Sequence, residues 1–168
     1  MGSNSGPVQM PKGKVISRRW RILRKLGEGG CGAVYKVEDL QTKKEAALKA
    51  ESNFVSGGSV LKLEVQILRR LTNKPYVAQL LHSGKRESYS YIVMTLLGES
   101  LRHITKRLGR IFSVSTQVRI GINVLFGLKQ IHDNRLRAPY VDVVLLLERE
   151  KEKTVSANAE SLCINSAT

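Results

Sequence analysis

The sequence predicts an α+β fold, in which an antiparallel sheet of five strands and one helix precede two further helices. Two observations support this fold class. Short strand-like runs separated by turn residues recur between residues 20 and 96. Apolar residues at helical spacing occupy residues 60–71 and 113–133. The 168 residues are enough for one domain with a core, or for a piece of a larger domain.

The elements of the sheet come first in the chain. We expect residues 1–15, which are rich in Gly, Ser, Asn and Pro and then in Lys, to form a flexible basic arm. The predicted strands lie at residues 20–26, 32–37, 45–50, 77–82 and 89–96. Residues 40–44 form the turn after the second strand, and residues 83–86 join the last two strands. The sheet domain is therefore placed at residues 16–96.

Three glycines, Gly27, Gly29 and Gly32, stand between the first two predicted strands. Glycine lets a backbone approach a phosphate closely, because no Cβ obstructs the approach. A dinucleotide motif needs a strand buried on both faces before the glycines, and residues 20–26 are too charged for that. No Gly-Lys-Ser/Thr completes a Walker loop. A nucleotide-covering hairpin, with Lys49 of the third strand neutralising a phosphate, and a plain glycine-rich hairpin both remain open.

The helix expected at residues 60–71 carries an acidic residue on its apolar side. Its apolar stripe consists of Leu61, Val65, Leu68 and Leu71. Glu64 lies three residues after Leu61 and four before Leu68, within this stripe. An inward carboxylate is costly unless a cation meets it, and Lys49 is the natural partner. The alternative is a Glu64 that reaches solvent from the edge of the stripe.

Two helices are expected after the sheet, within residues 97–133. A basic helix follows a short connection, at residues 100–108. Ser113 can cap a long helix that ends near Asp133. The residues expected to face inward on the long helix are Val118, Ile122, Leu125, either Leu128 or the aliphatic stem of Lys129, and Ile131.

Composition limits the partners. The formal net charge of +14 suggests acidic partners, such as phosphorylated proteins, nucleic acid or acidic filaments, without choosing among them. Of these we expect a protein partner that is acidic or phosphorylated. The basic residues lack the interleaved aromatics of RNA-binding surfaces, so we expect no nucleic-acid binding. Cys31 and Cys163 suit a reducing compartment, and the three histidines lack metal-ligand spacing. Without a signal peptide or a membrane-spanning apolar run, a cytoplasmic or nuclear protein is expected.

With these residues in view, the chain resembles the eukaryotic protein kinases, in particular the casein kinase I and tau-tubulin kinase group. The matching segments, between Arg19 and Asp133, are LGEGGCGAVY, AALK, LKLEVQILRRL, YIVMTLLGESL and QVRIGINVLFGLKQIHD. The stretch MTLLGESL is more specific than the glycines. The resemblance implies a kinase N-lobe at residues 16–96, the first helices of the C-lobe at residues 97–133, and ATP-dependent phosphorylation of protein serine or threonine.

The resemblance also implies which residues bind ATP: Leu26, Gly27, Glu28, Gly29, Gly32, Val34, Ala47, Lys49, Glu64, Met94, Thr95 and Leu97. In this family the glycines cover the phosphates, and Leu26 and Val34 lie against the adenine. Lys49 would hold the α- and β-phosphates and pair with Glu64. Met94 would stand at the back of the adenine pocket, with the backbone of Thr95 and Leu97 at the adenine edge. Cys31 departs from the family, since an aromatic residue usually tips this loop.

A larger departure begins after Asp133. The family continues into H-R-D-x-x-x-x-N and D-F-G, and neither motif is present. Asp142 cannot replace the catalytic Asp, because Leu147 stands where the Asn is required. Residues 134–168 have no counterpart that the resemblance identifies, and are expected to be an unrelated or disordered tail.

The missing motifs supply the Mg²⁺ ligands and the carboxylate that orients the substrate hydroxyl. We therefore expect an incomplete, truncated kinase domain in which Lys49 and Glu64 are the catalytic residues that remain. The expected behaviour is weak ATP binding, no metal site, and little or no phosphate transfer. The alternative is a pseudokinase-like module that binds a protein without catalysis.

Overall fold

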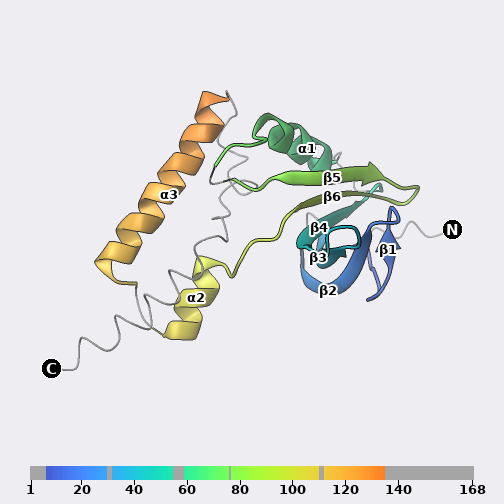
Figure 1. Cartoon of the computed structure of the whole chain (residues 1–168), viewed down its shortest axis with the longest axis horizontal. Helices are drawn as coiled ribbons and strands as arrows, with labels where there is room; N and C mark the ends of the chain where they lie inside the picture. Colours follow the sequence, from blue (N-terminus) through green and yellow to red (C-terminus); the bar gives the residue numbers. More distant parts are fainter. Residues whose placement is uncertain (1–6, 30–31, 55–58, 76, 110–111, 135–168) are drawn as a thin grey trace. The chain divides into compact units, whose positions relative to one another are not determined.

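The computed structural model describes residues 7–29, 32–54, 59–75, 77–109 and 112–134. They belong to two compact units. Figure 1 labels the helices and strands along the chain. The sheet unit comprises Met1–Asn73 and Ala78–Leu96. The helix unit comprises Lys74–Val77 and Leu97–Thr168.

The sheet unit contains a six-stranded antiparallel sheet in the order β1-β2-β3-β4-β6-β5. The strands are β1 (Val15–Ile16), β2 (Trp20–Gly29), β3 (Gly32–Asp39), β4 (Glu45–Ser52), β5 (Leu80–Lys85) and β6 (Tyr89–Thr95). The α+β fold and the five expected strands are confirmed. The sheet has one more strand than expected, because the two residues of β1 pair with the start of β2.

The described part of the N-terminal segment is packed, so the expectation of a flexible arm is wrong for residues 7–15. Met10 is 6% exposed, and its backbone N–H donates to the Tyr35 hydroxyl at 3.1 Å. That hydroxyl donates in turn to the carbonyl of Val8 at 2.6 Å. The Gly, Pro and Lys content of the segment concealed two apolar side chains that add to the core.

One face of the sheet forms the main core. Along β3 the buried and half-buried residues alternate, as expected for a strand with one face inside. The cluster on this face contains Met10, Ile16, Trp20, Ile22, Ala33, Tyr35, Val37, Ala46, Leu48, Ala50, Tyr89, Tyr91 and Val93. Because these residues come from five of the six strands, the sheet curls around them.

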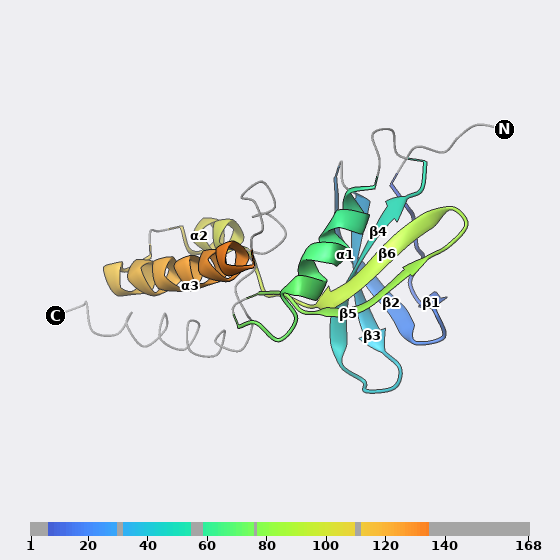
Figure 2. The same ribbon diagram turned by 90° about the horizontal axis from the view of Figure 1, so that it is seen from above.

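The opposite face of the sheet carries helix α1 (Val60–Arg70), which packs against β5 and β6 (Figure 2). Ser59 caps the helix by accepting a hydrogen bond from the Lys62 N–H. The buried residues of the helix are Leu61, Glu64, Ile67 and Leu68. Val65, which we expected to point inward, is only half-buried.

The hairpin of β5 and β6 lies further along the chain than we expected. Ser83 and Lys85 belong to β5, and Lys85 pairs with Ser90, so the turn falls on residues 86–88. Gly84, which suggested a turn in the sequence, lies within β5 for a different structural reason. A Cβ on Gly84 would lie 2.5 Å from the Tyr91 hydroxyl, so glycine makes room for this ring inside the strand.

The helix unit contains α2 (Leu101–Leu108) and α3 (Val114–Asp133), with Ser100 and Ser113 as their N-caps. Both helices match the sequence expectation. The expected inward face of α3 is only partly correct: Ile131 is buried, whereas Val118, Ile122 and Leu125 are exposed. The described residues of this unit are too few to cover a helix of 20 residues. No helix among the described residues has the length and apolarity needed to cross a membrane.

Candidate functional site

The glycine stretch forms the end of the β2–β3 hairpin. Gly27 lies opposite Val34, Glu28 opposite Ala33, and Gly29 opposite Gly32. Gly32 has a φ of 105°, and a Cβ there would lie 2.2 Å from the Ala50 carbonyl oxygen, so only glycine fits. Gly27 and Gly29 have nothing within 4 Å of the position of a Cβ. The hairpin therefore keeps open space beside these two glycines, which suits the close approach of a ligand.

A lysine lies two strands away from this open space, in register with it. Lys49 of β4 is opposite Val34 of β3, which is itself opposite Gly27 of β2. On its other side Lys49 is opposite Ile92 of β6. Directly opposed residues of neighbouring strands point to the same face. The sheet register therefore aligns the glycine hairpin and Lys49 across three strands.

The ammonium of Lys49 contacts the carboxylate of Glu64. Lys49 Nζ lies 2.5 Å from Glu64 Oε1, and the two side chains are 17% and 6% exposed. The contact expected from the helix pattern is therefore present, and the alternative of a solvent-facing Glu64 is wrong. Removing one member of such a pair leaves a buried charge without a partner, which typically destabilises a protein by about 3–5 kcal/mol.

A second carboxylate of β4 fixes the start of α1, and the sequence analysis missed it. Glu51 is 2% exposed and accepts hydrogen bonds from Ser59 Oγ at 2.5 Å and from the backbone N–H groups of Val60 and Leu61 at 3.2 and 3.3 Å. Glu51 and Lys49 are two residues apart in one strand, so both face α1. The sequence did contain a signal for this contact. An acidic residue stands two positions after Lys49, and a residue that caps a helix follows it in the chain.

Three further candidate residues lie on β4, which carries Lys49, and on the neighbouring strand β6. Ala47 is buried opposite Met94, and Met94 is half-buried near the end of β6. The Thr95 N–H donates to the Gln79 carbonyl at 3.0 Å. Leu97 belongs to the helix unit, whereas the other candidate residues belong to the sheet unit.

Leu26 and Glu28 are on the exposed part of the hairpin. Leu26 is 40% exposed. The Glu28 carboxylate pairs with the ammonium of Lys25, three residues earlier in the chain. Hydrogen bonds from Lys25, and then from Gln9, lower the pKa of Glu28 below its usual range. Because its side chain is hydrogen-bonded to neighbouring side chains, Glu28 can contact a ligand through its backbone.

The donor set of this site suits an anion rather than a metal ion. Backbone beside two unobstructed glycines, and an ammonium held by a carboxylate, fit a phosphate chain. Among the residues described by the structure, no three His, Cys, Asp or Glu side chains gather as metal ligands.

Comparisons with known proteins agree with the geometry. The family model described as the protein kinase domain matches residues 20–143, which is most of the chain. The chain therefore belongs to the protein kinase domain family. The match continues past Asp133, where we expected the resemblance to stop.

Its relatives are serine/threonine kinases, and casein kinase I proteins are among them. A Caenorhabditis elegans protein named as a serine/threonine-protein kinase is 52% identical over 134 residues, covering 79% of this chain and 39% of the relative. A second C. elegans protein, named as a casein kinase I, is 31% identical over 130 residues, covering 75% and 38%. The chain thus spans about two fifths of the length of these relatives.

A comparison with solved structures shows the same fold. A crystal structure of a kinase domain superimposes with a TM-score of 0.69 at 21% identity, covering 76% of this chain and 39% of the other. At this identity the likeness shows the fold alone.

Proposed function

We propose that the chain binds ATP as the nucleotide-binding part of a casein kinase I-like serine/threonine kinase. The observation that carries the proposal is the buried Lys49–Glu64 pair, in register with the open glycine hairpin. The pair holds the lysine at a fixed position, so little side-chain entropy is lost when a phosphate arrives. Kinases of this family use such a pair to hold the α- and β-phosphates.

The other candidate residues have proposed roles around the same nucleotide. The backbone at Gly27 and Gly29 would cover the phosphates, with Gly32 shaping the hairpin and Glu28 contributing its backbone. Leu26, Val34, Ala47 and Met94 would enclose the adenine. The backbone of Thr95 and Leu97 would bond its edge. Glu51 would be a positioning residue, because it holds the helix that carries Glu64.

The acceptor would be a serine or threonine of another protein. A complete reaction also requires Mg²⁺ ligands and a carboxylate that orients the hydroxyl. The 168 residues contain no H-R-D-x-x-x-x-N and no D-F-G. We therefore propose that this chain alone binds ATP weakly and transfers little or no phosphate. The net charge of +14 supports an acidic or phosphorylated protein partner.

Thermal unfolding with increasing ATP tests nucleotide binding, because a ligand that binds only the folded state raises Tm. The double variant Lys49→Met with Glu64→Leu removes both charges together and keeps an apolar pair of similar size, so the fold is retained. We expect ATP to raise Tm of the wild type and not of this variant. The matched control is Lys44→Ala in the β3–β4 turn, which should respond like the wild type. An equal response in all three proteins would contradict the proposed site.

A second candidate function is a pseudokinase-like module that binds a protein without catalysis. The observation that supports it is the net charge of +14, which suits an acidic protein partner. The two functions differ in ATP dependence. A folded chain whose Tm does not change with ATP, and which nevertheless binds a partner, supports the second candidate.

A further inference from the structure

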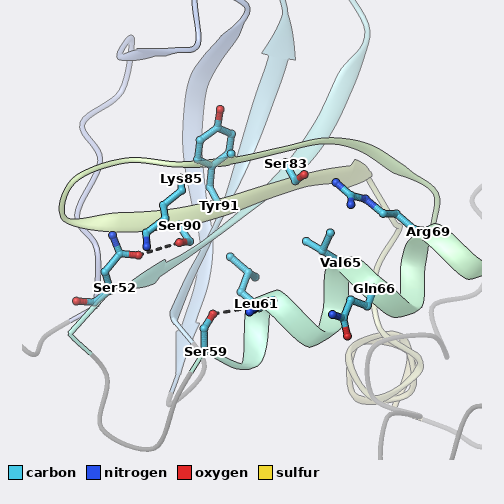
Figure 3. Close-up of a pocket in the computed structure, with 13 residues that line it drawn as sticks. Ser52, Ser59, Leu61, Val65, Gln66, Arg69, Ser83, Lys85, Ser90 and Tyr91 are labelled. Carbon is cyan, nitrogen blue, oxygen red and sulfur yellow. Dashed lines mark hydrogen bonds between the residues drawn. The ribbon is translucent and has the colours of Figure 1, made fainter.

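A groove of about 590 Å³ lies between α1 and the hairpin of β5 and β6, within the sheet unit (Figure 3). One wall is α1, from which Leu61, Val65 and Arg69 extend toward the strands. The other wall includes Ser83 and Lys85 of β5. Neither Lys49 nor Glu64 lines this groove, so it is separate from the proposed ATP site.

The charges of the groove are all positive. Lys62, Arg69 and Lys85 line it, and no Asp or Glu is among its lining residues. None of these three cations forms an ion pair with any residue of the described ranges. Arg19 and Lys36 of the same unit, by contrast, each pair with a carboxylate at 2.7 Å. The groove therefore gathers positive charge that the described chain does not neutralise.

The distance between the cations indicates what kind of anionic ligand can contact both of them. Lys62 and Arg69 are seven residues apart on α1, or about 10 Å along the helix axis. A single phosphate meets both cations only if their side chains converge on it, whereas an extended segment with two anions can meet each cation separately. An extended peptide advances about 3.3 Å per residue, and residues i, i+2 and i+4 share one side. Carboxylates at positions i and i+4 are thus about 13 Å apart, a span that the long Lys and Arg side chains can meet.

Between the two cations the groove offers apolar surface. Leu61 is buried, and Val65 is half-buried midway between Lys62 and Arg69. An apolar side chain at position i+2 of the peptide would lie over Val65 while the flanking carboxylates meet the cations. Partial burial leaves Val65 with apolar surface that an occupant can still remove from water.

We propose that this groove binds an acidic segment of a partner protein, in extended conformation, with an apolar side chain between two carboxylates. The proposal stands on the groove alone and does not require ATP binding or catalysis. It identifies a place on the sheet unit for the acidic partner that the net charge of the chain favours.

Fluorescence anisotropy of a labelled peptide with the central sequence Glu-Ser-Phe-Ser-Glu tests the proposal on the full chain. Lys62→Glu with Arg69→Glu should weaken binding by about tenfold or more. Lys43→Glu with Lys44→Glu, in the β3–β4 turn, changes the net charge equally and should alter binding by less than about twofold. Equal losses in both variants, or no binding by the wild type, would overturn the proposal.

Further variants separate the groove from general charge and from misfolding. Lys85→Glu reaches the groove from a different element, so it should also weaken binding even if the α1 variant does not fold. A peptide with Ser in place of the central Phe should bind about tenfold more weakly. A peptide whose only anion is one phosphoserine should also bind more weakly than the Glu peptide. Tighter binding of that phosphopeptide, or of a single-stranded RNA, would contradict an acidic peptide as the occupant.

Discussion

The two units of the molecule differ in how far their apolar side chains are buried. In the sheet unit Leu48 and Val93 are 0% exposed, and the sheet curls so that its own strands cover them. In the helix unit Val114 and Leu125 of α3 are 77% and 66% exposed. The strands of the sheet unit and α3 both have the apolar pattern of core-forming elements. Among the described residues, only the sheet unit has the side chains that cover its apolar face.

The difference follows from how each element closes a core. An antiparallel sheet with short turns can bury one face against itself, and α1 then covers part of the other face. A helix has to find another element for its apolar side. The sheet unit thus contains its own core and the Lys49–Glu64 pair, whereas α3 retains a surface of the kind that marks contact sites.

Truncation of a leucine in each unit gives the largest expected contrast. Leu48→Ala removes a fully buried side chain from the sheet and should lower the free energy of unfolding by about 2–5 kcal/mol. Leu125→Ala removes an exposed side chain and should change it by less than about 0.5 kcal/mol. Urea unfolding can be followed by the single tryptophan, Trp20, for the sheet unit and by circular dichroism for the helices. Equal losses would mean that Leu125 is covered in solution.

A glycine in each unit should respond with opposite sign. Gly32→Ala places a Cβ against the backbone of Ala50 at positive φ, and should destabilise the sheet unit by about 1–3 kcal/mol. Gly121 lies within α3, with nothing within 4 Å of a Cβ, so Gly121→Ala should stabilise the helix by up to about 1 kcal/mol. The same two unfolding signals measure both variants. Loss of helix signal in Gly121→Ala would show a close neighbour on that face.

The local patterns of the sequence were sufficient to predict the three helices, five of the six strands and the contact between Lys49 and Glu64. The stripe around Glu64 predicted an inward carboxylate, and because such a carboxylate needs a cation, Lys49 of the preceding strand was expected as its partner. The cap Ser113 could be predicted because N-capping depends on one side chain and its nearest backbone.

Features that depend on residues distant in the sequence could not be predicted from local patterns. Met10 lies in a segment of turn-forming residues, and only the fold shows that Tyr35 and Val8 hold that segment in place. Gly84 suggested a turn, whereas the ring of Tyr91 is the reason for a glycine there. The exposed side of α3 was expected to be buried, because periodicity shows which side is apolar and not whether another element covers it.

Ion pairs distinguish the two units as well. Arg19 donates from Nε and Nη2 to the two carboxylate oxygens of Asp39 at 2.9 and 2.7 Å, and Gln41 and Thr42 donate to the same carboxylate. The hydrogen bond from Arg19 is the main reason that the pKa of Asp39 lies well below its usual range. In α3, Lys129 and Asp133 form an exposed pair four residues apart at 2.7 Å.

A lowered pKa in the folded state stabilises the protein above the usual Asp pKa of about 3.9, and that stabilisation is lost as the pH falls below it. Asp39→Asn should therefore lower Tm at about pH 7, and its difference from the wild type should shrink toward about pH 3. Asp133→Asn should change the free energy of unfolding by less than about 0.5 kcal/mol at either pH. If the Asp39→Asn difference stays constant between the two pH values, the carboxylate acts through shape and not through charge. The polar contacts of the sheet unit would then resemble those of α3, and the contrast between the units would rest on apolar burial alone.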